Sequence, residues 1–273
     1  MIAEMFLTQI PHALVAALLA FPSMFIPVSL PHQTSTTTAS AIGIAATSSA
    51  SVITNVKTRE KVVALTFDAD MTPGMLAQLR THRVASWYNE QVIEVLTREQ
   101  VPATLFLTGM WIETYATATR ALSNNPLFEL GNHSYSHGGF TNHCYTLTPV
   151  PESHDVSEVE KTDALLSRNT TRHVKYFRFP GLCADAVNIA TVHALGYTII
   201  GGDVHGNDGF EKNRDHIVTN VLRSVRPGSI VVLHMHGGPN APETARALPI
   251  IIQKLRAEGY TFKTVSELLH DAH

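Results

Sequence analysis

The sequence predicts an α/β fold built around a parallel β-sheet, and two observations carry this prediction. Short apolar runs alternate with helical segments from residue 61 to the end of the chain. Parallel neighbours in a sheet need crossover connections, which helices supply, so this alternation is typical of parallel sheets. In addition, polar residues follow several of the apolar runs directly. The pattern alone does not separate an open sheet from a closed barrel, and both place function at the carboxyl ends of their strands.

The first expected strand is KVVALTF, residues 61–67, because it is short, apolar and rich in β-branched residues. The segment SWYNEQVIEVLTREQ, residues 86–100, places its apolar residues on one side of a helix. ATLFLTG, residues 103–109, then reads as a strand. A helix at 111–123 and a short strand, LFEL at 127–130, complete the first half of the fold.

A polar insertion separates this half from a helix expected at residues 156–167. KYFRF, residues 175–179, is the next expected strand. DAVNIATVHALGY, residues 185–197, has the form of a helix with Asp185 as its N-cap and Gly196 as its C-terminal stop. Both signals come from local backbone chemistry, so they define the bounds of this helix better than its apolar pattern does.

The last third of the chain repeats the alternation. YTIIGG and SIVVLHMH are expected strands, and a helix is expected between them and another after them. That last helix contains Pro249, which we expect to interrupt it because proline lacks the backbone N–H. These elements occupy residues 197–202 (strand), 214–228 (helix), 229–236 (strand) and 243–260 (helix), and TFKTVSELL at 261–269 closes the chain.

The N-terminal region differs in composition from the rest. Residues 1–30 contain the apolar run ALVAALLAF, which has signal-peptide length but is shorter than the roughly 20 residues a membrane-spanning helix needs. No Lys or Arg precedes Lys57, so the basic start of a standard signal is missing. Residues 31–56 read as a Ser/Thr-rich linker. We therefore expect a catalytic domain at 57–273 and a secreted or extracytoplasmic protein, with no stable membrane span.

Composition narrows the classes of function. The chain has 273 residues, of which 44% are hydrophobic, and this suffices for one large domain. Its net charge is −3 and no basic cluster is visible, which argues against a nucleic-acid partner. With only two cysteines, the chain is neither a disulfide scaffold nor a cysteine-rich zinc module.

The polar residues at the strand ends form a chemically coherent set. Three carboxylates, four imidazoles and a guanidinium would meet at one mouth of the sheet. Two imidazoles presented by one loop (GNHSYSHGG) are a recurring metal-ligand arrangement. Random placement would scatter such residues along the chain. The set consists of Asp68, Asp70, His133, His137, Arg178, Asp203, His234 and His236.

The same residues, in the same order, resemble the polysaccharide deacetylase family (the NodB homology domain, carbohydrate esterase family 4). The family motifs correspond here to TFDAD, HSYSH, RFPG, GGDVHGND and VLH. The resemblance covers residues 61–269 and implies a distorted (β/α)7-type barrel with a single catalytic domain. It also implies a divalent metal, commonly zinc, and an N-acetylated polysaccharide or oligosaccharide as substrate. Two departures stand out: Ala69 separates aspartates that are adjacent in the family, and no Trp follows the fourth motif.

The resemblance and the chemistry of amide hydrolysis together suggest a role for each residue. His133, His137 and one carboxylate would hold the metal, and a second carboxylate, Asp68, would act as general base. His234 would protonate the leaving amine. By family analogy Arg178 orients the base, and Asp203 is expected to hold Arg178. His236 is a weaker candidate for a ligand or catalytic role.

The stretch TFDADM leaves the choice between the two aspartates open. Residues two apart on a strand point to the same side, so Asp68 and Asp70 can both face the mouth. Strict alignment makes Asp68 the base and puts Ala69 at the ligand position, which would leave only two protein ligands. We expect a small bulge after Phe67 to bring Asp70 to the metal, because catalytic zinc usually keeps three protein ligands. The reverse assignment remains possible.

Three further expectations concern the surroundings. Cys144 and Cys183 follow two of the motifs closely, so they should lie at the same mouth and could form a disulfide; two free thiols are the alternative. Tyr135 and Trp111 could stack on a sugar ring or could pack in the core. Two rival functions remain open: a metal-independent hydrolase of a small amide or cyclic imide, and a non-catalytic carbohydrate-binding barrel.

Overall fold

The computed structural model describes residues 50–271 of the chain. The signal-like segment expected at residues 1–30, and the expected linker up to residue 49, lie outside the described residues. Within the described part, no helix combines the length and the apolar character required to cross a bilayer.

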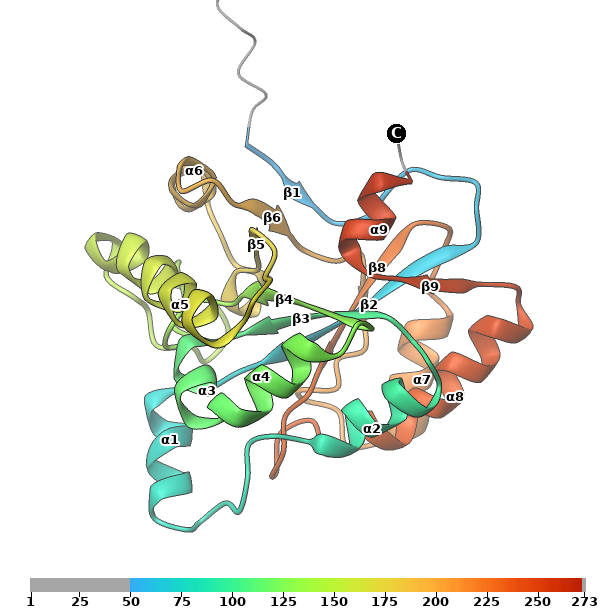
Figure 1. Cartoon of the computed structure of the whole chain (residues 1–273), viewed down its shortest axis with the longest axis horizontal. Helices are drawn as coiled ribbons and strands as arrows, with labels where there is room; N and C mark the ends of the chain where they lie inside the picture. Colours follow the sequence, from blue (N-terminus) through green and yellow to red (C-terminus); the bar gives the residue numbers. More distant parts are fainter. Residues whose placement is uncertain (1–49, 272–273) are drawn as a thin grey trace, which may run out of the picture. The chain divides into compact units, whose positions relative to one another are not determined.

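The described strands form one curled parallel sheet (Figure 1), which confirms the predicted α/β class and the distorted barrel type. The order across the sheet is β1-β6-β5-β4-β3-β2-β8-β7, and β9 pairs with β2; every pairing between these strands is parallel. The strands are β1 Val52–Ile53, β2 Val62–Ala69, β3 Ala103–Leu107, β4 Phe128–Asn132, β5 Tyr176–Phe177, β6 Thr198–Ile200, β7 Val204–His205, β8 Ser229–His234 and β9 Thr261–Lys263.

Strand β2 lies at the centre of the sheet, and all eight of its residues are buried. Its run of Val, Ala and Leu suits a strand covered on both faces, as parallel sheets require. On one side β2 pairs with β8, and this register places Asp68 opposite His234. On the other side, Asp68 lies opposite Phe106 of β3. The pairing of β2 with β8 therefore places Asp68 beside His234.

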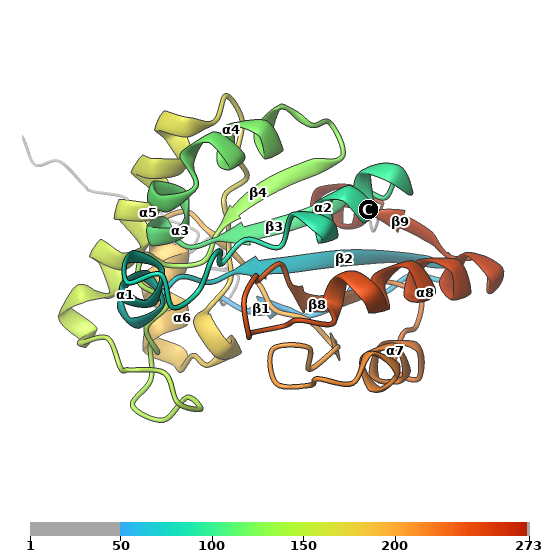
Figure 2. The same ribbon diagram turned by 90° about the horizontal axis from the view of Figure 1, so that it is seen from below.

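The helices surround the sheet (Figure 2), with α2 and α7 packed against α8, and with α3 and α6 packed against α5. Several have side-chain caps, including Asp185 on α6 and Thr264 on α9, each in a reciprocal capping box. The helices are α1 Pro73–Arg80, α2 Glu90–Arg98, α3 Gly109–Thr114, α4 Ala116–Asn124, α5 Asp155–Asn169, α6 Ala186–Ala194, α7 Arg214–Leu222, α8 Thr244–Ala257 and α9 Val265–His270, with short 3-10 turns at Glu152–His154 and Pro180–Leu182.

The structure corrects four expected boundaries. Helix α1 lies in a stretch where a loop was expected, although Thr72 caps it. The helix expected at 111–123 is broken at Tyr115, whose hydroxyl accepts a hydrogen bond from the backbone N–H of Trp87 (2.8 Å). Helix α8 continues through Pro249 instead of stopping there. Strand β1 lies inside the expected linker, so the folded domain begins before residue 57.

Candidate metal centre and active site

The polar residues identified in the sequence gather at the carboxyl ends of β2, β4, β5 and β8. Six of the eight line a cavity of about 890 Å³, which opens between the loops that follow these strands: Asp68, Asp70, His133, His137, His234 and His236. Asp68 lies near the end of β2, and Asp70 follows it. His133 follows β4, and His234 is the last residue of β8. The prediction that these residues meet at one mouth is therefore confirmed for all of them except Asp203.

Asp70 is the hub of the cluster. Its Oδ2 lies 3.2 Å from His137 Nε2 and 2.8 Å from His236 Nε2, and its Oδ1 lies 3.4 Å from His133 Nε2. Oδ1 is buried and accepts no hydrogen bond from the described residues. One ligand atom each from Asp70, His133 and His137 can be chosen so that all three lie within 4.8 Å of one another. A carboxylate and two imidazoles at this spacing match the ligand types and number of a catalytic zinc site.

No bulge is needed to bring Asp70 into the cluster. The pairing of β2 with β3 is regular through Asp68 and Ala69, and Asp70 is the first residue beyond the strand. Ala69 is fully buried. The expectation of a bulge after Phe67 was therefore wrong, because the chain leaves the strand in time for Asp70 to turn toward the histidines.

The HSYSH loop holds its histidines in a strained backbone. Ser134 and His137 have positive φ angles (65° and 55°), which cost non-glycine residues about 1 kcal/mol or more each. Glu158, buried on α5, accepts hydrogen bonds from the backbone N–H groups of Tyr135 and Ser136 (3.0 and 2.8 Å). Glu158 thus anchors this loop to α5, a role that was not expected from the sequence.

The ring orientation of His133 suits a ligand. Its Nδ1 lies 2.8 Å from the backbone carbonyl of Arg178, which can only accept a hydrogen bond. The proton of a neutral ring therefore belongs on Nδ1, and the lone pair of Nε2 faces Asp70. A carbonyl that fixes the tautomer in this way is the usual outer contact of a metal-bound histidine.

The pKa values in the cluster shift in different directions. Burial lowers the pKa of His137 to about 4, although Asp70 acts against this shift. Burial also lowers the pKa of His133, but the facing Asp68 and Asp70 outweigh it, and the net shift is upward from 6.5. Burial raises the pKa of Asp70, but His137, His236 and His133 outweigh it and bring that pKa well below 3.8. Asp70 therefore stays ionised, and His137 stays neutral, over the whole range near neutrality.

Arg178 pairs with Asp68 in the floor of the cavity. Its Nη1 donates to Asp68 Oδ1 at 2.7 Å, and its side chain is fully buried, with the guanidinium carbon 4.1 Å from the ring centre of Phe106. The remaining donors reach the backbone carbonyls of Ile200 (3.3 Å) and Gly201 (2.9 Å). Because Arg178 occupies Oδ1, the second oxygen of Asp68 is the one that lies toward the cluster, 3.7 Å from His133 Nε2.

Asp203 does not hold Arg178, so that expectation was wrong. Its carboxylate accepts hydrogen bonds from the hydroxyl of Ser229 (3.2 Å) and the N–H of Ile230 (3.0 Å), and it pairs with Arg226 (3.1 Å). These partners lie at and before the start of β8, at the opposite end of that strand from His234. Asp203 follows β6 and precedes β7, so its side chain braces the sheet instead of facing the cavity.

Asp208 is the carboxylate of this segment that reaches the site. It is fully buried, and its Oδ1 lies 2.8 Å from His234 Nδ1. Its Oδ2 accepts from the N–H of His234 (2.8 Å) and from the hydroxyl of Thr244 (2.6 Å). Burial lowers the pKa of His234, but Asp208 outweighs burial and raises that pKa to about 10. The sequence contained a signal for Asp208, because the motif GGDVHGND contains both Asp203 and Asp208.

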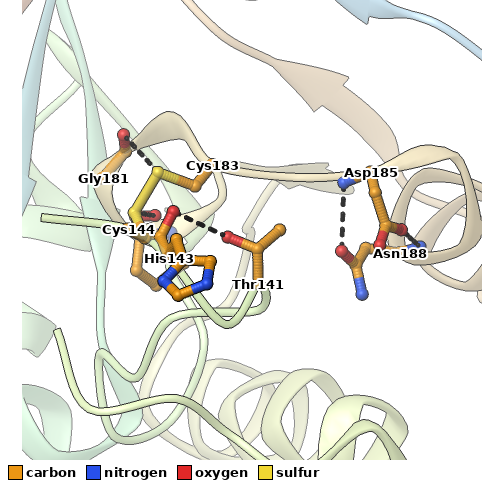
Figure 3. Close-up of a disulfide and its surroundings, with 8 residues drawn as sticks. Thr141, His143, Cys144, Gly181, Cys183, Asp185 and Asn188 are labelled. Atoms are coloured by element: carbon orange, nitrogen blue, oxygen red, sulfur yellow. Dashed lines mark hydrogen bonds between the residues drawn. A yellow bond between two sulfur atoms is a disulfide. The ribbon is translucent and has the colours of Figure 1, made fainter.

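The predicted disulfide is confirmed: Cys144 and Cys183 are bonded, with their Cα atoms 5.9 Å apart (Figure 3). The bond joins the loop after β4 to the loop after β5. Gly181 allows this approach, because its φ is +61° and a Cβ there would lie 2.5 Å from Cys144 Sγ.

The aromatic side chains at the rim differ from those expected. Trp111 is fully buried, and the hydroxyl of Tyr135 donates to Glu113 (3.0 Å). Instead, Tyr145 and Phe210 line the cavity with 74% and 75% of their surface exposed, and their ring centres lie 5.8 Å apart.

Comparison with known proteins identifies the family. The sequence profile described as "Polysaccharide deacetylase" matches residues 55–200, more than half of the chain. The chain belongs to the polysaccharide deacetylase family. A bifunctional xylanase/deacetylase of Pseudobutyrivibrio xylanivorans is 29% identical over 209 residues, which make up 77% of this chain and 30% of that protein. A peptidoglycan-N-acetylglucosamine deacetylase of Bacillus cereus is 27% identical over 222 residues, 80% of this chain and 92% of the relative.

Solved structures support the same membership. A CE4-family pseudoenzyme from Bacillus anthracis matches with a TM-score of 0.66 at 24% identity, over 81% of this chain and 69% of that one, a likeness that shows the fold. A family 4 acetyl xylan esterase from Clostridium thermocellum, in complex with a cobalt ion, matches with a TM-score of 0.62 at 28% identity, over 77% of this chain and 91% of that one. Polysaccharide deacetylases are hydrolases of carbon–nitrogen bonds, and this chain is an enzyme of that class.

Proposed function

We propose that this polysaccharide deacetylase is a metal-dependent hydrolase that removes N-acetyl groups from amino sugars of a cell-wall or extracellular polysaccharide. The observation that carries the proposal is the presence of three separate chemical units in one cavity. Asp70, His133 and His137 form a candidate zinc site, Asp68 is a carboxylate held by an arginine, and His234 is an imidazole paired with a buried carboxylate.

The candidate base is Asp68. A divalent ion bound at the cluster would polarise the acetyl carbonyl and lower the pKa of a nearby water toward about 7. Asp68 Oδ2 then accepts a proton from the attacking water, because Oδ1 is committed to Arg178. Arg178 fixes the carboxylate in place, so that Oδ2 is oriented to act as a base.

The candidate acid is His234. Its Nδ1 is committed to Asp208, so its Nε2 is the nitrogen that can deliver a proton to the leaving amine. An amine is a poor leaving group unless it is protonated, and general acid catalysis of this kind contributes about 10²- to 10⁴-fold. The raised pKa of His234, about 10, keeps that proton in place at neutral pH. Asp208 therefore positions His234, a role that was not assigned from the sequence.

Two observations support a polymeric sugar as the substrate. The cavity is open and about 890 Å³ in volume, enough for more than a single acetyl group. Exposed aromatic rings at its rim are suited to the apolar face of a sugar ring, and Tyr145 and Phe210 form such a pair. Phe210 lies two residues after Asp208, so it supplies an aromatic wall in the segment where the family tryptophan is missing.

The disulfide supports a location outside the cytoplasm. Bonds of this kind persist in oxidising compartments and are rare in reducing ones. The bond between Cys144 and Cys183 therefore agrees with the secreted or extracytoplasmic location expected from the N-terminal segment.

The proposal is tested by measuring acetate release from N-acetylglucosamine oligomers and from peptidoglycan, with and without added zinc. Release that requires zinc supports it. Turnover of a small amide or cyclic imide by metal-free protein would favour the first rival function instead. Binding of the oligomers without any acetate release would favour the non-catalytic barrel.

The two aspartates give a sharper test of the assignment. Asp70→Ala should lose metal, because it removes the shared carboxylate. Asp68→Asn should retain metal and lose most of its turnover, because an amide cannot accept the proton. Elemental analysis and acetate release are measured on both variants. Normal metal content and wild-type turnover in Asp70→Ala would reverse the assignment.

A further inference from the structure

One buried histidine at the site has no part in the chemistry proposed above. His236 lies two residues beyond the end of β8, with 3% of its surface exposed. Its Nε2 is 2.8 Å from Asp70 Oδ2. Its Nδ1 is buried and has no hydrogen-bond partner among the described residues, which is uncommon for a buried polar atom. The contact with Asp70 does not by itself explain why His236 also lies next to His234, the candidate acid.

His236 is stacked on His234. Their ring centres lie 4.9 Å apart and their planes differ by 19°. Asp208 already occupies Nδ1 of His234, so Nε2 is the nitrogen of His234 left free. One ligand atom each from Asp70, His234 and His236 can be chosen so that all three lie within 4.8 Å of one another. The spacing requirement met by Asp70, His133 and His137 is thus met a second time, with only Asp70 in common.

We propose that Asp70, His234 and His236 form a second divalent-ion site, which fills when zinc-like ions are in excess. Two imidazoles and a carboxylate are ligands that zinc accepts. Asp208 supplies the outer carboxylate that commonly orients a metal-bound histidine. The carboxylate of Asp70 has two oxygens, one for each ion, and a shared ligand of this kind is compatible with ions about 3.5 to 4 Å apart.

The second ion inhibits the enzyme, and this consequence rests on the proposed function. When the ion binds, Nε2 of His234 releases its proton to solvent and gives its lone pair to the ion. His234 then has no proton for the leaving amine. The first ion is therefore required for turnover, while the second blocks it. The site itself does not depend on which substrate the enzyme uses.

Ion counting tests the site directly. Zinc is titrated into chelator-stripped protein, and bound zinc per chain is measured by elemental analysis after gel filtration and by calorimetry. We expect two ions per chain for the wild type and one for His236→Gln, because glutamine can still donate to Asp70 but has no imidazole lone pair. His193→Asn, an exposed histidine on α6, is the matched control and should bind two.

A single ion in the wild type, or two ions in a folded His236→Gln, overturns the site. If His236→Gln fails to fold, as its melting curve would show, the wild-type count still decides. The inhibitory role is tested by acetate release against free zinc. At zinc about ten times the dissociation constant of the second site, mass action predicts an approximately tenfold lower rate.

The ratio of the peak rate to the rate in excess zinc should stay near one in His236→Gln. Equal inhibition of the wild type and the variant would overturn the inhibitory role. The two proposals fail in distinguishable ways. If no acetylated sugar is hydrolysed under any condition, the proposed function fails, whereas the zinc count still measures the second site.

Discussion

Two pairs of histidines lie at the mouth of the sheet, and one imidazole of each pair has a strongly shifted pKa, in opposite directions. His133 and His137 share one loop after β4, and His137 has its pKa lowered to about 4 by burial. His234, at the end of β8, has its pKa raised to about 10, because Asp208 outweighs the effect of burial. Near neutrality, His137 is therefore a lone-pair donor, whereas His234 is a proton donor.

The difference between the pairs comes from the carboxylates beside them. His137 competes with other histidines for the one shared charge of Asp70, while His234 has a buried carboxylate of its own. A dedicated carboxylate stabilises the charged imidazole, and burial without one removes that charge. Environments that push the pKa values of like groups apart are the usual means by which one site combines acid and base chemistry.

The largest effect should come from removing the lone-pair donor. His137→Ala leaves Asp70 and His133, which are too few ligands for a stable catalytic zinc site. A bound ion supplies several kcal/mol of transition-state stabilisation, so we expect turnover to fall by about 10³-fold or more. Zinc content by elemental analysis should fall with it. Full metal content in this variant would place the ion elsewhere.

The next effect should come from removing the dedicated carboxylate. In Asp208→Asn the pKa of His234 should return from about 10 toward its ordinary value of 6.5. The proton-donating form then disappears above about pH 6.5 instead of about pH 10. We expect about 30-fold lower turnover at pH 8, because about 1.5 pH units above the pKa only a few per cent of His234 keeps its proton, and an alkaline limb of the kcat profile displaced to lower pH. An alkaline limb that stays in place would show that His234 is not the acid.

A pH titration of metal affinity should show the contrast within the loop. The pKa of His133 is raised above 6.5, so one proton must leave when metal binds below that pKa. The pKa of His137 is about 4, so its proton does not compete until that pH is reached. The logarithm of the zinc dissociation constant should therefore rise by about one for each pH unit below the pKa of His133, and more steeply below about pH 4. Chelator competition measures this slope, and turnover should fail on the same acidic side.

The smallest catalytic effect should follow the loss of Asp203. Asp203→Asn removes the pairing with Arg226 and weakens the acceptor for Ser229 and Ile230, all outside the cavity. We expect turnover within about twofold of the wild type. The free energy of unfolding should fall by about 1 kcal/mol, measured by urea denaturation. A loss of activity as large as that of Asp208→Asn would return Asp203 to the catalytic set.

The features that could be predicted from the sequence are those that depend on periodic apolar patterns. The parallel sheet was predictable, because buried strands are recognisable as apolar runs. The meeting of Asp70, His133 and His137 was predictable as well, because the carboxyl ends of parallel strands lie at the same edge of the sheet. Asp208 was missed because β7 has only two residues, too few to show as a strand. His236 was undervalued, although it lies two positions from His234 at the end of the same strand. Tyr145 and Phe210 could not have been selected, because loop residues placed by tertiary contacts carry no period.

The disulfide stabilises the part of the molecule that would bind a long substrate, and it is separate from the contacts that hold the catalytic groups. His133 and His137 lie in the first part of the loop after β4, which Glu158 anchors. The bond between Cys144 and Cys183 joins the later part of that loop, next to Tyr145, to the loop after β5. Protein produced in a reducing cytosol, without this bond, should therefore keep its turnover of small acetylated compounds and lose affinity for long polysaccharide chains. Redox conditions during production would then change how tightly the enzyme binds a polymer, while the bond that it cleaves stays the same.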